Sequence, residues 1–218
     1  MERAEALARL NTLVGCDLVE LGKQYGVTIW KGQRINKGWA GHTIERYLGL
    51  ALNSSRSPNF GSWELKVVPI RALANGALKV KETMAVTMID PVEVAAKGFA
   101  ESHLFLKLKR MLVLGRLFES KAESRSICHM VAEFDLDDRD LYRQIEADYD
   151  LVRTVIRTRG FSHLTGAMGS LVQPRTKGPG HGSTSRAFYA RPALVSRILG
   201  LVGHSPTGDT GKTFEHER

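Results

Sequence analysis

Two charged side chains flank Leu65 in the stretch SPNFGSWELK, which covers residues 57 to 66. Because residues i and i+2 of a strand project to the same face, Glu64 and Lys66 would point together toward one ligand. A carboxylate binds a hard cation such as Mg²⁺, and an ammonium group beside it can orient a water and stabilise negative charge on a phosphate. The pair favours metal-dependent phosphodiester hydrolysis, although the same spacing also occurs on the solvent face of ordinary strands.

A Mg²⁺ site needs further oxygen ligands, and the sequence offers two candidates. Asn59 stands five residues before Glu64, where a second carboxylate would complete the site, and it offers a neutral carbonyl oxygen. Glu45 lies 14 residues before Asn59, on an expected helix that could aim it into the same cleft. We predict that Asn59 and Glu64 hold Mg²⁺, with Mn²⁺ able to substitute, and that Glu45 assists the site.

The elements that must position these residues follow from apolar spacing and turn-forming residues. Asn75 and Gly76 predict a hairpin turn between two strands. The returning strand is expected to place Val80, Glu82 and Met84 on one face. Asp137 or Asp138 is a plausible cap of the clearest helix. The expected helices cover 1–23 (one or two helices), 38–52, 137–158 and 192–201, residues 99–112 read as a helix running into a strand, and strands are expected at 63–70, 78–89, 110–118, 171–178 and 186–190.

Composition indicates a globular chain with a polyanionic partner. The 218 residues are 43% hydrophobic and 25% charged, and 31 Lys and Arg against 23 Asp and Glu give a net charge of +8. This excess favours nucleic acid or an acidic membrane surface as the partner. The sequence has no apolar run that could span a bilayer and no secretory signal, and its two cysteines form no disulfide framework. We expect a protein of the bacterial or archaeal cytoplasm that does not bind membranes.

The segments around Glu64 resemble the MutH family of DNA endonucleases, which includes a mismatch-repair nickase and related type II restriction enzymes. KGWAGHTIE at 37–45, then Asn59, then ELK at 64–66 follow the order of the MutH motifs K-G-W-x-G-x-x-x-E, Asp and E-L-K. The gap between position 59 and Glu64 is shorter than in MutH. It is similar to the gap in the restriction enzyme MvaI, with Asn in place of the acid.

The resemblance extends over roughly residues 20 to 200 and implies further site residues. ESHLFLKLKRML at 101–112 is similar to a MutH segment with K-L-K-R, which implies that Lys107 is a second catalytic lysine. LVQPRTKG at 171–178 resembles the strand whose Arg and Lys read GATC, and RAFYARPALVSRIL at 186–199 carries the R-x-F-Y pattern with a base-contacting tyrosine. The expected catalytic residues are Glu45, Asn59, Glu64, Lys66 and Lys107, and the expected DNA-binding residues are Lys37, Arg175, Lys177, His181, Ser183, Arg186 and Tyr189.

The fold implied by the resemblance is α/β, an α+β mixed sheet flanked by helices. It is the PD-(D/E)-x-K restriction-endonuclease-like core, with two lobes and a DNA cleft between them. We expect one domain over residues 1–202, with the catalytic lobe mainly in 20–115 and the recognition elements mainly in 160–200. The polar tail, 203–218, is expected to be disordered.

The implied function is sequence-specific, Mg²⁺-dependent cleavage of double-stranded DNA at or near GATC. The shorter gap before Glu64 favours a type II restriction enzyme, and the alternative is a MutH-type mismatch-repair nickase acting with MutL. Either a monomer or a homodimer is compatible with the sequence. A catalytically silent, sequence-specific DNA-binding protein is the further alternative, which Asn59 favours. Because Asp to Asn is the smallest change that removes this charge, we hypothesise that the natural residue at position 59 is aspartate.

Overall fold

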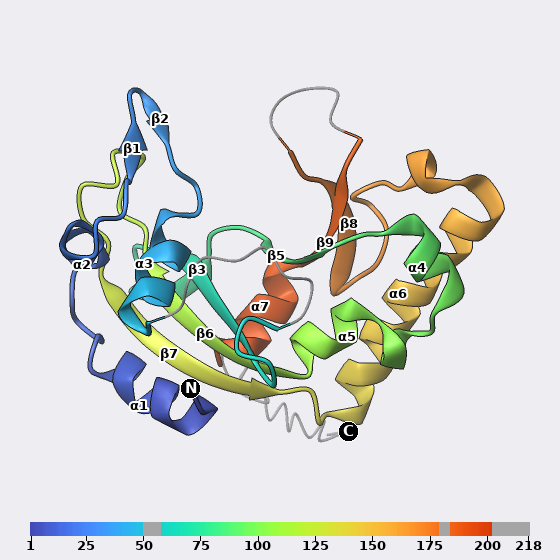
Figure 1. The fold of residues 1–218 in the computed structure, drawn as a ribbon, viewed down its shortest axis with the longest axis horizontal. Helices are drawn as coiled ribbons and strands as arrows, with labels where there is room; N and C mark the ends of the chain where they lie inside the picture. The colour runs from blue at the N-terminus through green and yellow to red at the C-terminus, as the bar shows by residue number, and fades with distance from the viewer. Residues whose placement is uncertain (50–57, 179–183, 202–218) are drawn as a thin grey trace, which may run out of the picture.

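Two larger sheets lie next to each other in the computed structural model, which describes residues 1–49, 58–178 and 184–201 (Figure 1). The first has the strand order β4-β3-β6-β7, with β3 and β6 parallel and the other pairs antiparallel. The second is antiparallel throughout, with the order β5-β9-β8. The strands are β3 (Glu64–Ala72), β4 (Leu78–Val80), β5 (Met84–Met88), β6 (Arg110–Leu117), β7 (Cys128–Asp135), β8 (Val172–Thr176) and β9 (Arg186–Ala190).

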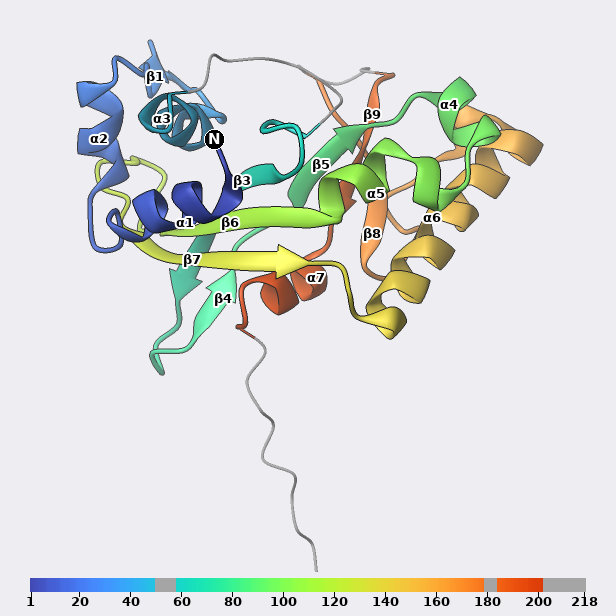
Figure 2. The same ribbon diagram turned by 60° about the horizontal axis from the view of Figure 1, so that its bottom comes forward.

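Helices cover these sheets, and a small hairpin of β1 (Trp30–Lys31) and β2 (Arg34–Ile35) projects beside them. Figure 2 shows α1 against β6 and β7 at one side of the molecule and α6 along β8 at the other. No helix within the described ranges is long and apolar enough to cross a bilayer. The helices are α1 (Arg3–Asn11), α2 (Leu18–Gln24), α3 (Trp39–Tyr47), α4 (Pro91–Ala96), α5 (His103–Leu108), α6 (Arg139–Arg159) and α7 (Pro192–Ile198), with short 3₁₀ turns η1 (Phe99–Glu101) and η2 (Phe161–His163).

The mixed sheet flanked by helices confirms the predicted fold class and is consistent with a restriction-endonuclease-like fold. Several predicted elements agree closely with the structure. The side chain of Asp138 caps α6 by accepting hydrogen bonds from the N–H groups of Asp140 and Leu141, and Gly76 turns the β3–β4 hairpin with φ of 80°. The helix predicted at 38–52 ends earlier, because α3 stops at Tyr47 and Gly49 adopts φ of 82°. The predicted tail lies outside the described residues.

The single strand predicted at 78–89 is wrong, because the chain leaves the first sheet after Val80 and enters the second at Met84. The cause lies in the partner strand. Lys81 donates its N–H to the carbonyl of Pro69 at 3.0 Å, but Pro69 has no N–H to donate in return. The antiparallel ladder therefore ends there, and residues 81–83 cross between the sheets. Glu82 lies on this crossing rather than on a continuous strand face.

Two apolar cores support the site region. The smaller packs α1, α2 and α3 against the first sheet and contains Trp39 and Trp63, each 1% exposed. The larger contains buried residues of α5, α6 and α7 and of both larger sheets, among them Tyr149 and Phe188. The rings of Tyr149 and Phe188 lie 5.6 Å apart, which joins α6 to β9 through an aromatic contact.

Asp148 fixes α6 to β8 through its carboxylate, and the residue is 4% exposed. Its two oxygens accept backbone N–H groups from Ser170, Leu171 and Val172 at 2.8, 2.7 and 2.8 Å. These donors sit where the chain enters β8, whose first residue, Val172, pairs with Ala190 of β9. The carboxylate therefore sets the position of the strand that carries Arg175.

We expect Asp148→Ala to lower the free energy of unfolding by about 3 kcal/mol, because it leaves buried backbone donors without an acceptor. Urea unfolding followed by circular dichroism measures this change. Asp150→Ala is the matched control on the same helix, since the Asp150 side chain is 53% exposed and reaches Arg153 only at 4.0 Å. Its expected loss is under about 1 kcal/mol. Equal losses in the two variants would contradict the role of Asp148.

Candidate active site

Glu64 is the first residue of β3 and is fully buried. Its Oε1 accepts hydrogen bonds from Nζ of Lys66 at 2.5 Å and Nζ of Lys107 at 3.2 Å. Its Oε2 accepts the backbone N–H of Asn59 at 3.0 Å. A buried carboxylate is stable only when it is paired and hydrogen-bonded, and these three donors meet that requirement.

The topology explains why the two lysines converge on Glu64. Glu64 and Lys66 share a face of β3, as the alternation of a strand requires. Lys107 lies near the end of α5, which leads directly into β6, and β6 runs parallel to β3 with Met111 opposite Glu64. The start of β3 and the end of α5 are therefore neighbours at the same end of the two central strands.

Asn59 joins α3 to this cluster. Its side-chain Nδ2 donates to Oε1 of Glu45 at 2.9 Å, while its backbone N–H donates to Glu64. One residue thus connects two carboxylates that lie 19 positions apart in the chain, on α3 and on β3. The structure brings Glu45, Asn59, Glu64, Lys66 and Lys107 into one hydrogen-bonded group.

Burial shifts two of these groups away from their charged forms. Burial raises the pKa of Glu45, with His42 and Lys66 opposing the shift and Glu64 adding to it. Burial also lowers the pKa of Lys107, which the Glu64 carboxylate opposes and the Lys66 ammonium group reinforces. Perturbed groups of this kind gather at functional sites, where charge is held in readiness for a ligand.

A cavity of about 480 Å³ opens onto the cluster between the two sheets. Its walls come from α3, from β3 and from β5, and Lys107 and Lys177 also line it. Burial lowers the pKa of Lys177, and Lys66 and Lys107 lower it further, so these three ammonium groups interact electrostatically. Lys37 lines the cavity as well. Anionic ligands would be drawn to this concentration of ammonium groups.

The other predicted DNA-binding residues divide into three groups. Arg175 and Tyr189 line an adjacent cavity of about 470 Å³, which shares Lys37, Lys66 and Glu82 with the first. The Arg175 guanidinium lies 5.8 Å from the Tyr189 ring centroid and donates to Oγ1 of Thr83 at 3.0 Å. Arg186 begins β9 opposite Thr176 and does not line either of these two cavities. His181 and Ser183 lie outside the described residues.

Burial raises the pKa of Tyr189, Glu82 adds to that rise, and the Arg175 guanidinium opposes it. The phenol therefore keeps its proton and can both donate and accept a hydrogen bond. Together Arg175 and Tyr189 present a planar cation and a hydroxyl at the entrance to the cluster, a combination suited to base edges or phosphates.

Two residues of the cavity wall, His42 and Glu82, are not predicted as site residues from the sequence. His42 lies half-buried on α3, three positions before Glu45. Residues three apart on a helix share a face, so this spacing was the signal that could have placed it beside Glu45. Glu82 was assigned to a continuous strand, and only the break after Val80 brings it to the cavity.

The oxygen-bearing side chains of the cluster fit a Mg²⁺ ion in kind. Glu45 and Glu64 supply carboxylates and Asn59 a carboxamide oxygen, all hard ligands. Within the described ranges no cluster of three or more His, Cys, Asp or Glu side chains is placed to hold a metal. At this site the third oxygen donor would be the neutral Asn59 rather than an acid, so the cluster offers a cation less negative charge than three carboxylates would.

The fold is consistent with the restriction-endonuclease-like class, and the cluster places Glu64, Lys66 and Lys107 together at the start of β3. Residues 48–145 match the family model described as DNA mismatch repair enzyme MutH. Three proteins named DNA mismatch repair protein MutH are similar over nearly the whole chain. The one from Shewanella sp. (strain MR-4) is 25% identical over 91% of this chain and 95% of its own length. Those from Haemophilus ducreyi and Vibrio cholerae are 27% and 24% identical, over 90% and 89% of this chain and 92% and 94% of their own lengths. These matches support the assignment of the chain to a MutH-like nuclease family.

We expect the Glu45 carboxyl group to titrate above its usual pKa, and higher still in Asn59→Asp, where a second carboxylate replaces the amide donor at 2.9 Å. Because the folded-state pKa is raised, the folded protein binds this proton more tightly than the unfolded chain does. The resulting stabilisation is present at low pH and is lost as the pH rises through the folded pKa. Carboxyl-carbon NMR titration measures the pKa of Glu45 in the parent chain and in Asn59→Asp.

Asp135 is an internal control for the same titration. Its hydrogen bond from Arg3 lowers its pKa, so it must titrate in the opposite direction from Glu45. A Glu45 midpoint at or below the usual glutamate value, with Asp135 shifted as expected, would show that the carboxylate of Glu45 is well solvated and not part of the buried cluster.

Proposed function

We propose that this protein is a Mg²⁺-dependent DNA endonuclease of the MutH type, which nicks double-stranded DNA at or near GATC and acts with a MutL partner. The observation that carries the proposal is the hydrogen-bonded group of Glu45, Asn59, Glu64, Lys66 and Lys107 in a cavity between the two sheets. The relatives described above are named mismatch repair proteins, which favours the repair nickase over the type II restriction enzyme that the short gap before Glu64 suggested.

The chain's own residues can bind and orient a DNA phosphate. Glu64 holds the ammonium groups of Lys66 and Lys107 side by side, and the Lys66 side chain, 20% exposed, reaches the cavity. These groups would stabilise the negative charge that grows on the phosphate during cleavage. Glu45, with its raised pKa, can hold or release a proton at the same place. When bound by Glu45, Asn59 and Glu64, Mg²⁺ would supply an acidified water and further charge neutralisation.

Recognition elements reach the same place from the second sheet. Arg175 can donate two parallel hydrogen bonds to guanine O6 and N7 in the major groove, a contact that discriminates by about 1–3 kcal/mol. Tyr189 lies beside it on the neighbouring strand β9. Lys177 follows the last residue of β8 directly and lines the proposed catalytic cavity. It is therefore better placed for a phosphate than for a base. The second sheet would thus read the sequence and also contribute a cation to cleavage.

Asn59 favours a second candidate, a DNA-binding protein of the same fold that does not cut. The amide of Asn59 donates to Glu45, so the two carboxylates are satisfied without a metal ion. Such a protein would keep the basic cavity and the Arg175 and Tyr189 contacts. It would differ from the enzyme only in its affinity for the cation.

Asn59→Asp separates the two candidates. We expect the variant to bind Mg²⁺ more tightly and to cleave GATC-containing plasmid at least about tenfold faster, because a third carboxylate joins the site and metal catalysis contributes several kcal/mol. Agarose-gel assays on unmethylated, hemimethylated and fully methylated plasmid, with and without MutL, would measure nicking and double-strand cutting. End sequencing of the products would give the cut position.

Glu64→Ala in the Asn59→Asp background is the negative control and must abolish the gain. If Asn59→Asp cuts no faster than the parent chain and Glu64→Ala has no effect on either, the catalytic proposal is wrong and the silent DNA-binding protein remains. Unaided double-strand cutting with no response to MutL would instead favour the restriction enzyme.

In the Asn59→Asp background, substitutions of Lys177 and Arg175 should affect different properties, the cleavage rate and the sequence discrimination. We expect Lys177→Met to slow cleavage about tenfold or more at every sequence, because it removes a charge near the reacting phosphate. We expect Arg175→Met to weaken discrimination between GATC and single-base variants by about tenfold. Cleavage rates on matched oligonucleotides measure both effects. Lys79→Met, an exposed lysine of β4, is the control and should change neither. A loss of sequence discrimination in Lys177→Met, with cleavage slowed at every sequence in Arg175→Met, would indicate instead that Lys177 contacts a base.

A further inference from the structure

A second pocket lies beside the catalytic cavity, beneath the β1–β2 hairpin, and we call it the hairpin pocket. Its volume is about 420 Å³, within the range of small-molecule sites. Trp30 and Ile35 of the hairpin form one wall, and Lys81, Phe118 and Lys121 form the other. No residue of the proposed catalytic cluster lines it.

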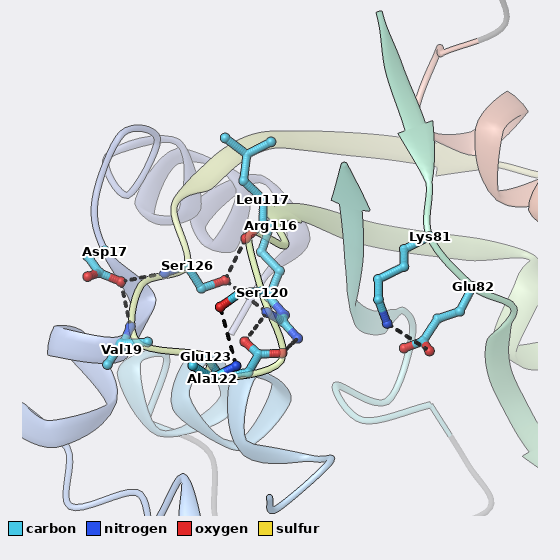
Figure 3. A network of polar contacts seen from close by, with 10 residues as sticks. All are labelled: Asp17, Val19, Lys81, Glu82, Arg116, Leu117, Ser120, Ala122, Glu123 and Ser126. Carbon is cyan, nitrogen blue, oxygen red and sulfur yellow. Dashed lines mark hydrogen bonds and ion pairs between the residues drawn. The ribbon is translucent and has the colours of Figure 1, made fainter. Parts of the chain in front are cut away.

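The floor of the hairpin pocket is rigid and charged. Arg116 donates from Nη1 and Nη2 to the two carboxylate oxygens of Glu123 at 2.7 and 3.0 Å, and from Nη1 to Oγ of Ser126 at 2.9 Å. Both members of this ion pair are more than nine-tenths buried. The guanidinium also lies 5.1 Å from the Trp39 ring centroid. Figure 3 shows this network facing Lys81 and Glu82 across the space between the strands.

Backbone conformation at Glu123 supports the view that this floor is held in place. Glu123 adopts φ of 46°, the only positive φ of a non-glycine residue in the part of the chain that the structure describes. Such a conformation costs free energy and persists where surrounding contacts fix it. Ser126 contributes further, because its backbone N–H donates to Asp17 at 2.9 Å and so ties the loop to α2. A fixed floor can orient a ligand without first being ordered by it.

The walls combine aromatic faces with ammonium groups. Trp30 is 41% exposed, an unusual position for the largest apolar side chain. The Nζ of Lys81 lies 4.1 Å from the centroid of the Phe118 ring, a cation–π contact at the rim. Lysines 37, 81 and 121 and Arg116 line the pocket against only two acids, Glu82 and Glu123. Aromatic faces for stacking within a basic groove are the features that bind single-stranded nucleic acid.

The hairpin pocket adjoins the catalytic cavity, since Lys37, Glu82 and Arg116 line both. A DNA strand placed with its phosphate at Lys66 and Lys107 would pass Lys37 as it leaves the cavity. The next nucleotide along that path would meet Trp30 and Phe118.

We propose that the hairpin pocket binds an unpaired nucleotide of the DNA strand that occupies the catalytic cavity, stacking its base on Trp30 or Phe118. The inference rests on the proposed function in that DNA must lie in the catalytic cavity. It adds a subsite for a base that has left the duplex next to the cutting site. The protein would thereby prefer DNA that is frayed, gapped or opened beside its target sequence.

The test compares a blunt GATC duplex with the same duplex carrying a short single-stranded thymidine extension, by fluorescence anisotropy in EDTA so that no cleavage occurs. We expect the extension to tighten binding about tenfold, within the range of base–aromatic stacking. Trp30→Ala should abolish this gain and Trp30→Phe should retain it. Phe118→Ala tests the second ring, and circular dichroism verifies the fold of each variant. Leu151→Ala, at an exposed apolar position on α6, is the control and should keep the full gain.

Intrinsic fluorescence gives an independent readout, because Trp30 is 41% exposed whereas Trp39 and Trp63 are 1% exposed. The extended duplex should quench the emission of the parent chain, and the quenching should disappear in Trp30→Phe.

Two results would overturn the proposal. One is equal binding of the blunt and extended duplexes by the parent chain. The other is a gain that survives in Trp30→Ala and Phe118→Ala but is lost in Lys81→Gln, which would mean that the pocket contacts phosphate alone. Failure to bind either duplex would refute the proposed function itself, whereas tight but equal binding refutes only the hairpin pocket.

Discussion

The buried carboxylate of Glu64 is the interaction on which the site depends. An ionised group in this position would cost several kcal/mol if it were unpaired, so its surroundings must supply donors. They come from three parts of the chain: Lys66 on the same strand, Lys107 on α5 and the backbone of Asn59. Each donor requires its element to stand in one place. The parallel pairing of β3 with β6 and the packing of α3 on β3 are thereby linked to one side chain.

The second sheet depends on a different constraint, the missing N–H of Pro69. This proline ends the β3–β4 ladder and sends the chain from one sheet to the other within residues 81–83. Lys81 and Thr83 then contact separate structures, the Phe118 ring and the Arg175 side chain. The crossing segment thus contacts both the hairpin pocket, through Lys81, and β8, through Thr83.

Local pattern predicted most of the elements that carry the site. The E-x-K spacing placed Glu64 and Lys66 on one face of β3, and the N-terminal cap at Asp138 followed from the acids before α6. The ladder break at Pro69 was readable in principle, but it required knowledge of which residue would pair with it. No element is predicted from the sequence for β7 (Cys128–Asp135), for α4 (Pro91–Ala96) or for the β1–β2 hairpin, because these are short or half-exposed segments stabilised by tertiary contacts.

For the site, the residue types and their strand or helix positions were predictable, whereas the distances among them were not. Nothing in the spacing of Glu45 and Asn59 indicates that the amide of one donates to the carboxylate of the other. Lys177 was expected among bases by resemblance, but its position in the cavity beside Lys66 and Lys107 depends on how the second sheet is set against the first. His42 and Glu82 were overlooked for the same reason, since each reaches the cavity through packing rather than through a motif.

The amide at Asn59 leaves the cluster formally neutral, with two carboxylates, Glu45 and Glu64, against two ammonium groups, Lys66 and Lys107. A neutral cluster needs no cation to fold, so the architecture of the cleft and its capacity to cut are separable properties. On the proposed function, one exchange at this partly exposed loop position would change the second without disturbing a buried side chain. A lineage with such a site could change between cutting DNA and only binding it by a single nucleotide substitution. The fold would be the same in both states.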